Sequence, residues 1–340
     1  MKIRVIRVDL PVKHVLTYSR GAISVARTIV VELEQDGLRG HGEVQENPYY
    51  NITVEELTEH VLKTQEMLDD YAMADPVSMW RYLKPVLSVS PYAQSAVDIA
   101  ACDLWGKIRN KPLWYIWKLH PTLPLPKTCF TIGIDTIDQV IERFNENPNW
   151  PIYKIKLGGK NDMQMVRELR KLTNAVFRVD VNGMWNVETV LHYASELKAL
   201  GVEFIEQPLP PDDWEGMEIL KNQCPLPIMA DESCASEDDI DRCAEYFFGI
   251  NAKPCKFGGL TPMRDALTHA KEKGLKILLG CGIESTIAIS ASAQFVSMAD
   301  YLDLDGPQLI EKKVGTGVCS ENGELTFPNE NGTGIRVLFR

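Results

Sequence analysis

The sequence predicts an α/β protein whose larger part is a parallel β/α barrel of the TIM type, and three observations predict it. From residue 129 onward, eight strand-like runs recur about every 25 residues. Amphipathic helical patterns lie between these runs. The length of 340 residues exceeds the usual size of one domain and allows a large barrel with additions. A doubly wound open sheet is the alternative, but no glycine-rich phosphate-binding fingerprint follows any strand.

The first 120 residues follow a different pattern, which predicts antiparallel strands and then helices. The N-terminus alternates apolar and charged residues, and the run TIVVELEQDGLRGHGEV contains two strand-like halves around a glycine turn. Thr53 and Glu56 form a capping-box pattern, so we expect one helix over 54–71 and a second over 95–110. Three prolines within 120–128 then indicate a boundary between domains.

The strand-like runs of the predicted barrel are separated by recognisable helix signals. Asn186, Ser236 and the pair Thr261–Pro262 stand where helices are expected to begin. Gly201 and Gly274 stand where helices are expected to end. The eight runs are CFTIG, IYKIKLG, VFRVD, VEFIEQ, LPIMADE, FFGINAK, KILLG and YLDLD.

Composition and charge exclude several classes of function. The formal net charge is −11 and no basic cluster occurs, which argues against a nucleic-acid surface because phosphates require concentrated Lys and Arg. No run of about 18 apolar residues is present, so a membrane span is not expected. The N-terminus lacks the apolar core of a signal peptide, so we expect a cytoplasmic protein. The eight cysteines form no C-x-x-C pair, which favours reduced thiols over disulfides or a zinc site.

Charged residues gather where the predicted strands end. Side chains at these ends converge on one mouth of a barrel. Lys154 and Lys156 point to the same side because strand side chains alternate, and so do Asp180 and Asn182. Lysines therefore flank a run of acids. The other charged residues at strand ends are Glu206, Asp231, Glu232 and Lys253.

These acids predict a site for a hard divalent cation. Three successive strands end in carboxylates, which would repel one another without a compensating positive charge. Carboxylate oxygens suit Mg²⁺ or, as a substitute, Mn²⁺, whereas Zn²⁺ prefers His and Cys, and none of the six histidines falls at a predicted strand end. The alternative is that each acid only caps a helix or lies on the surface, as single acids after strands commonly do.

The lysines then acquire a role in proton transfer. A nearby cation and the neighbouring Lys154 disfavour the charged form of Lys156, as a general base requires. Lys253 ends the sixth strand on the opposite side of the metal, while Lys256 is the less suitable base. Two proton carriers that face each other across a Lewis acid imply removal of a proton on one face and its return on the other. A solvated loop lysine is the alternative for Lys253.

At these positions the sequence resembles the enolase superfamily, and within it the muconate-lactonizing-enzyme subgroup. The resemblance covers essentially the whole chain and is carried by YKIKLG, VDVNGMW, FIEQP, MADES and INAKPCKFGG, in this order. It implies a modified TIM-type barrel over 123–310. An α+β capping domain, built from 1–122 and the returning tail 311–340, would close over it. The residues that match the family's acid/base lysines are Lys156 and Lys253, and those that match its metal ligands are Asp180, Glu206 and Asp231.

The last two strands of the barrel separate the subgroups of this superfamily. The mandelate-racemase type carries a His at the end of the seventh strand, but here that strand ends ILLGCGIES, and enolase itself lacks the Lys-x-Lys pair. Asp303 and Asp305 resemble the element by which dipeptide epimerases hold a substrate's α-ammonium group, and opposite charge explains the match. A helix-capping or solvated pair is the alternative.

Two further residues are expected to contact the substrate. Arg20 lies where the family's cap loop covers the site, and it could pair with an acidic substrate side chain such as that of glutamate. Glu284, in the segment that follows the seventh strand, is also assigned to substrate binding.

The resemblance therefore implies an Mg²⁺-dependent dipeptide epimerase of the L-Ala-D/L-Glu type that acts on cell-wall peptides. The carboxylate of the C-terminal residue would chelate Mg²⁺, one lysine would remove the α-proton, and the other would reprotonate the opposite face of a metal-stabilised enediolate. Lys154 would stabilise the developing oxyanion, and Glu232 would orient its neighbours. The sequence leaves open which lysine serves which enantiomer, and whether the protein is a homo-oligomer.

Two other functions remain. A muconate cycloisomerase or an o-succinylbenzoate synthase of the same subgroup would need the same metal and lysines, but not Asp303 and Asp305. A catalytically silent barrel that binds a small carboxylate or a partner protein is the more distant alternative, and the intact set of lysines and acids argues against it.

Overall fold

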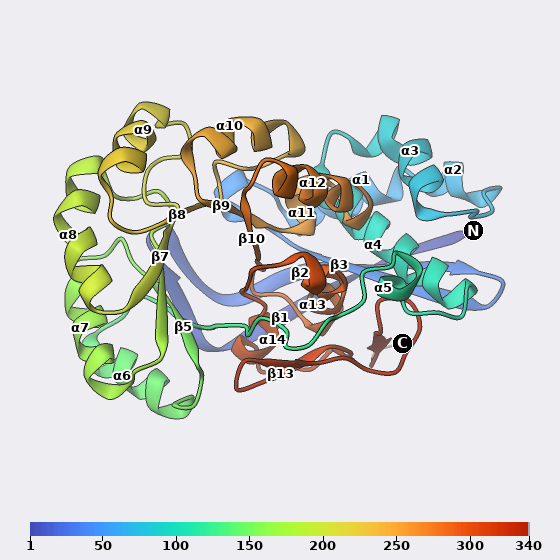
Figure 1. Ribbon diagram of the computed structural model, residues 1–340. Coiled ribbons are helices and arrows are strands. Elements are labelled where there is room, and N and C mark those ends of the chain that lie inside the picture. Colours follow the sequence, from blue (N-terminus) through green and yellow to red (C-terminus); the bar gives the residue numbers. More distant parts are fainter. Residues whose placement is uncertain (339–340) are drawn as a thin grey trace.

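The computed structural model describes residues 1–338 and begins with a three-stranded antiparallel sheet (Figure 1). Its strands are β1 (Lys2–Tyr18), β2 (Gly21–Gln35) and β3 (Leu38–Gln45), in that order. Asp36 and Gly37 form the turn between β2 and β3 with positive φ angles of 53° and 80°, as a tight hairpin requires. The predicted meander is confirmed.

The second predicted helix of this region is the one that packs most closely on the sheet. It is α4 (Pro91–Ile108), and it begins four residues before the expected start because Ser90 caps it and Pro91 occupies its first position. α4 lies so close to β3 that a Cβ atom at Gly42 would come within 2.1 Å of the Ala96 carbonyl oxygen. Only glycine therefore allows this contact.

The first predicted helix is interrupted. The capping box of Thr53 and Glu56 is present as expected. A single helix over 54–71 is wrong, however, because the helix ends at Leu62 and the Thr64 hydroxyl bonds back to a carbonyl of the preceding turn. The remaining helical elements of this region are η1 (Pro48–Tyr50), α1 (Val54–Leu62), α2 (Gln65–Asp69), α3 (Pro76–Leu87) and α5 (Leu113–Ile116).

Eight parallel strands form the larger part of the molecule, and they pair in chain order. A parallel bridge between Thr128 and Leu302 joins the two edges, so the sheet closes on itself. This is the expected TIM-type barrel. Each strand-like run of the sequence contributes one strand: β4 (Phe130–Ile132), β5 (Ile152–Lys156), β6 (Val176–Asp180), β7 (Val202–Glu206), β8 (Ile228–Ala230), β9 (Gly249–Ala252), β10 (Lys276–Leu279) and β11 (Tyr301–Leu302).

Helices connect these strands and lie around the outside of the barrel (Figure 1). Asn186 caps α8 as expected, and Gly201 and Gly274 follow helices in the left-handed conformation. Ser236 begins a short 3₁₀ turn, and Thr261–Pro262 lie in the first turn of α12. Within residues 1–338, every helix is too short or too polar to cross a lipid bilayer. The helical elements are α6 (Ile137–Glu146), α7 (Asp162–Leu172), α8 (Val187–Ala199), α9 (Trp214–Gln223), η2 (Glu237–Asp239), α10 (Ile240–Tyr246), α11 (Pro254–Phe257), α12 (Leu260–Glu272), α13 (Thr286–Ser292) and η3 (Ala293–Met298).

After the barrel, the chain returns to the N-terminal region. The Glu311 amide donates to the Pro11 carbonyl at 2.9 Å, and the Leu113 amide donates to the Gly332 carbonyl at 2.7 Å. These contacts support our proposal that the capping domain comprises 1–122 and 311–340, of which the last two residues lie outside the described part. The helix α14 (Gly306–Leu309) leads into this segment, whose strands are β12 (Gly315–Thr316), β13 (Cys319–Glu321), β14 (Glu324–Thr326) and β15 (Arg336–Val337).

Candidate active site

A cavity of about 170 Å³ lies at the carboxyl ends of the barrel strands, beneath residues of the capping domain. Most of the predicted site residues line it. Asp180 and Glu206 do not; they are fully buried, and each lies within ion-pair distance of Lys154, which does line the cavity. The predicted site residues that line the cavity are Arg20, Lys154, Lys156, Asp231, Glu232, Lys253, Glu284, Asp303 and Asp305.

The barrel brings the three predicted metal-binding acids together. Asp180 and Glu206 are the last residues of β6 and β7 and are paired in register on these neighbouring strands. Asp231 follows β8 directly. The exposed fraction is 0% for Asp180 and Glu206 and 4% for Asp231, so three carboxylates share one nearly dry region. Such a group requires positive charge close by.

Lys154 supplies part of that charge, which explains why one of the two neighbouring lysines is buried. Its Nζ atom lies 3.0 Å from Asp180 Oδ2, 2.9 Å from Glu206 Oε2 and 2.7 Å from Asp303 Oδ2. The four residues come from β5, β6, β7 and the segment after β11. Lys154 is therefore the central cation of an acidic cluster.

Lys156 and Lys253 lie on two flanks of this cluster. Lys156 Nζ donates to Asp180 Oδ2 at 2.6 Å and to Asn182 Oδ1 at 3.3 Å. Lys253 Nζ donates to Asp231 Oδ2 at 2.7 Å. The side chains of the two lysines are 15% and 21% exposed, against 5% for Lys154. Both therefore remain within reach of a ligand in the cavity.

Lys256 differs from these two lysines. It donates to Asp231 Oδ1 at 2.9 Å and to the Asp231 carbonyl oxygen at 2.7 Å, and its side chain is 4% exposed. It fixes the loop that carries Asp231. This placement agrees with the prediction that Lys256 is the less suitable base.

The negative charge of the cluster dominates the titration of its members. Burial favours neutral Lys154 and Lys253, but the surrounding carboxylates outweigh burial and hold the pKa of both lysines well above the usual value. Burial, together with neighbouring Asp180, raises the pKa of Glu206 to about 7. The charge of Lys154 is thus compensated by three acids.

The donor set fits a hard divalent cation. Besides the three carboxylates, the oxygens Glu232 Oε2 and Asn251 Oδ1 are buried without a hydrogen-bond partner. Buried polar atoms are rarely left without one. Carboxylate and amide oxygens are the ligands that Mg²⁺ prefers. The region can therefore hold Mg²⁺ through Asp180, Glu206 and Asp231.

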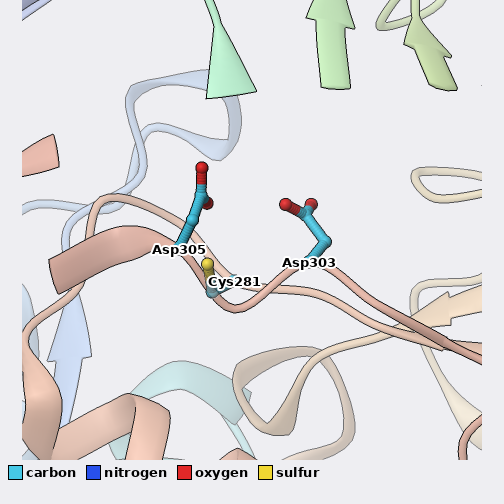
Figure 2. A group of neighbouring side chains, drawn as sticks. All are labelled: Cys281, Asp303 and Asp305. Carbon is cyan, nitrogen blue, oxygen red and sulfur yellow. The ribbon is translucent and has the colours of Figure 1, made fainter. Parts of the chain in front are cut away.

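A second acidic group, Asp303 and Asp305, contacts Lys154 through Asp303. Asp303 Oδ1 accepts from the Cys129 thiol at 3.1 Å, and Asp305 Oδ2 accepts from the Thr131 amide at 2.6 Å. Figure 2 shows that both carboxylates project from the segment after β11 and that Cys281 lies beside Asp305. Ligand atoms of Cys281, Asp303 and Asp305 lie within 4.8 Å of one another. A thiol suits Mg²⁺ poorly, so this group is a less suitable magnesium site than the three acids.

Arg20 and Glu284 enter the cavity from different directions. Arg20 Nε donates to the Asn182 carbonyl oxygen at 2.8 Å, and the guanidinium carbon lies 4.4 Å from the centre of the Tyr49 ring. Glu284 accepts from the Gly282 amide at 3.2 Å, and burial raises its pKa to about 7. Arg20 therefore approaches the cavity beside Lys156, whereas Glu284 follows β10.

Sequence reasoning missed several residues of the site. Tyr49, Tyr50 and Tyr92 of the capping domain line the cavity. Gln207 accepts from the Asp231 amide at 3.0 Å and donates to the Ser233 hydroxyl at 2.8 Å, so it links the loops after β7 and β8. Gln207 belongs to the FIEQP segment, and that segment is the signal that could have identified it. No local pattern marks the tyrosines.

Comparisons with known proteins agree with this geometry. The family model described as "Mandelate racemase / muconate lactonizing enzyme, N-terminal domain" matches residues 2–117, and the one described as "Enolase C-terminal domain-like" matches residues 137–339. An L-Ala-D/L-amino acid epimerase of Flavobacterium johnsoniae is 42% identical over 338 residues, which cover 99% of this chain and 100% of the relative.

Two further relatives extend the comparison. An L-Ala-D/L-Glu epimerase of Bacteroides thetaiotaomicron is 35% identical and covers 99% of this chain and 88% of its own length. The structure of a dipeptide epimerase from Enterococcus faecalis, in complex with Mg and the dipeptide L-Leu-L-Tyr, superposes with a TM-score of 0.90 at 26% identity and covers 98% of both chains.

Proposed function

Since the chain belongs to the mandelate racemase and muconate lactonizing enzyme family of the enolase superfamily, we propose that it is an Mg²⁺-dependent dipeptide epimerase of the L-Ala-D/L-Glu type. One observation carries the proposal. Lys156 and Lys253 lie on two flanks of the group formed by Asp180, Glu206 and Asp231. A single α-carbon placed between two such lysines can lose a proton to one and regain it from the other.

The acids and Lys154 would prepare the site for this exchange. Asp180, Glu206 and Asp231 would hold Mg²⁺, which would offset the negative charge that a substrate carboxylate gains when the adjacent proton leaves. Lys154 adds a fixed positive charge 2.7 to 3.0 Å from three carboxylates, and it would face the same developing charge. Glu232 accepts from Asn182 Nδ2 at 3.1 Å and thereby helps to orient a partner of Lys156.

The two catalytic lysines would alternate between acid and base. Each is held by a carboxylate within 2.7 Å, which fixes the Nζ atom on its side of the site. The lysine that starts neutral accepts the α-proton, and the charged lysine on the other flank donates a proton to the opposite face. The configuration of the C-terminal residue inverts, and no oxidation or reduction takes place.

The ends of the dipeptide would be recognised by charge. Asp303 and Asp305 would hold the α-ammonium group of the N-terminal residue, because both are buried acids at the edge of the cavity. Arg20 would pair with an acidic side chain of the C-terminal residue, and Glu284 would line the substrate. The substrate of a cycloisomerase or succinylbenzoate synthase has no ammonium group for this acidic pair to hold, so the pair disfavours both alternatives.

Isotope exchange tests the proposal directly. The protein is incubated with Mg²⁺ and L-Ala-L-Glu in D₂O, and mass spectrometry and chiral chromatography follow the C-terminal residue. We expect one deuterium at its α-carbon together with L-Ala-D-Glu. Chelation should stop the reaction, and added Mg²⁺ or Mn²⁺ should restore it. Absence of both exchange and inversion with Ala-Glu and with a panel of other dipeptides would reject the function.

A further inference from the structure

A second cavity adjoins the first. It has a volume of about 40 Å³ and lies between strand β1 of the capping domain and strand β4 of the barrel. Leu16, Thr131 and Leu309 line both cavities, so they form the wall between them. The other residues around the second cavity are Lys13, His14, Val15, Phe130, Gly133, Arg143, Glu146, Asn147 and Gln308.

Leu16 and Leu309, the leucines of this wall, separate the two cavities without polar side-chain contacts. Leu16 follows an irregularity in the pairing of β1 with β2, and its Cδ1 atom would lie 3.0 Å from a Cβ atom at Gly133. Leu309 ends α14, four residues after Asp305. Both leucines pack with Ile23 against the hydrophobic cluster that joins β1 to the C-terminal segment. Their truncation would therefore leave no buried polar group without a partner.

The wall begins beside the acidic pair. Asp305 Oδ2 accepts from the amide of Thr131, and Thr131 is itself part of the wall. In the proposed function, Asp303 and Asp305 hold the ammonium group of the substrate's N-terminal residue. The side chain of that residue leaves the same α-carbon, so it lies next to the wall.

The size of the second cavity matches a small branched side chain. A cavity needs about 10–15 Å³ in this measure for each water-sized group, so 40 Å³ has room for about three such groups. Leucine exceeds alanine by three carbon atoms. Val15, Phe130 and the two wall leucines give the cavity an apolar lining, while His14 and Arg143 are already paired with Glu146 and Asp135.

We propose that the second cavity is a latent subsite for the side chain of the substrate's N-terminal residue, and that Leu16 and Leu309 keep it closed. The two leucines then restrict this residue to alanine or a similarly small residue. The inference rests on the proposed function, because that function places the N-terminal residue at Asp303 and Asp305. To the proposed function it adds the residues that determine which N-terminal residue the enzyme accepts.

Substrate series on wall variants test this inference. kcat/KM is measured for Gly-Glu, Ala-Glu, Val-Glu and Leu-Glu with the native protein, Leu16→Ala and Leu309→Ala. We expect the ratio of Leu-Glu to Ala-Glu to rise about tenfold or more in at least one variant, because three additional carbons become buried. Ile6→Ala is the matched control, because Ile6 packs against the same hydrophobic cluster but lines neither cavity, and its truncation should leave the ratio unchanged.

Calorimetric affinities for the same peptides separate the possible failures. If Ala-Glu binds without being epimerised, the proposed function fails, while the affinity ratio still decides the subsite. An unchanged ratio in both folded wall variants would overturn the inference, and so would an equal rise in Ile6→Ala. Absence of binding of all four peptides to the native protein would reject both proposals.

Discussion

The two flanks of the acidic cluster are built from different parts of the molecule. Lys156 ends the barrel strand β5. Its two contacts come from the neighbouring strand β6, because Asp180 ends that strand and Asn182 lies two residues later. Lys253 follows β9 and precedes a loop that runs through α11 to α12. Helices of the capping domain fasten that loop. One lysine is therefore held within the barrel, and the other depends on contacts between the two domains.

The contacts that fasten the Lys253 loop are specific. Trp80 of α3 donates to the Gly258 carbonyl oxygen at 3.0 Å. Asp98 of α4 accepts from the Thr261 amide at 2.8 Å. Gly259, with φ +127°, lets the loop pass so close that an added Cβ atom would lie 2.4 Å from Asp98 Oδ2. The capping domain thus does more than cover the cavity, since it also positions one flank of the site.

Apart from changes to the two lysines themselves, the largest effect should come from a change to an acid of the cluster between them. We expect Asp231→Asn to weaken Mg²⁺ binding and to lower turnover by about 10²- to 10³-fold, because it removes a proposed metal ligand and the partner of Lys253. Calorimetric titration with Mg²⁺ and the exchange assay measure the two effects. Asp241→Asn, which changes an exposed ion pair on α10, is the control. Full turnover by thoroughly chelated protein would contradict the metal role.

Asp303 lies on neither flank. Its substitution should lower the affinity for the substrate and leave the relative proton transfer by Lys156 and Lys253 unchanged. Asp303→Asn should lower kcat/KM for Ala-Glu by about ten- to a hundredfold, because a charged hydrogen bond is worth about 1.5 to 3 kcal/mol. N-acetyl-Ala-Glu presents no cation and should lose less. Equal losses for both peptides would show that Asp303 acts through Lys154, its partner at 2.7 Å, and not on the ammonium group.

A change in the capping domain should affect one flank alone. We expect Asp98→Ala to slow the proton exchange that depends on Lys253 by about tenfold, because a misplaced proton carrier loses efficiency steeply. Asp98→Asn keeps an oxygen for the Thr261 amide and should lose less. Deuterium exchange is measured from each enantiomer of the C-terminal residue. A similar decrease for both enantiomers would contradict the division of the site into two flanks.

The last expected effect concerns the pH dependence of stability and not turnover. Burial raises the pKa of Asp98 to about 7, so between pH 4 and pH 7 the folded state keeps a proton that the unfolded chain releases. The stability contribution of Asp98 therefore falls as pH rises through this window. Asp98→Asn should gain stability over the native protein by up to a few kcal/mol from pH 4 to pH 7, and no further above it. Denaturant unfolding at several pH values measures this gain, and a pH-independent difference would contradict it.

Much of the fold followed from local patterns. The eight strands and the left-handed glycines after α8 and α12 depend on residues close in sequence, and they are confirmed. The interruption of the helix over 54–71 was not predicted, because Thr64 is compatible with a helix until its hydroxyl finds the preceding turn. Patterns of three or four residues do not resolve that competition.

The site was predictable to the extent that strand ends converge. The barrel places Lys156, Asp180 and Asp231 together because each stands at a strand end. The contact of Lys154 with Asp303 joins residues 149 positions apart and depends on closure of the barrel. The same holds for Asp98 and Thr261, 163 positions apart in different domains. No pattern of neighbouring residues in the sequence predicts either contact.

Exchange catalysed by the two lysine variants tests the central claim most directly. Lys156→Ala and Lys253→Ala are each incubated with L-Ala-L-Glu and with L-Ala-D-Glu in D₂O, and deuterium at the C-terminal α-carbon is measured by mass spectrometry. Both variants should lose epimerisation by about 10²- to 10⁴-fold. Any exchange that remains should be confined to one enantiomer, and to opposite enantiomers in the two variants. Epimerisation at the native rate by either variant, or exchange of the same enantiomer by both, would contradict proton transfer between two flanks.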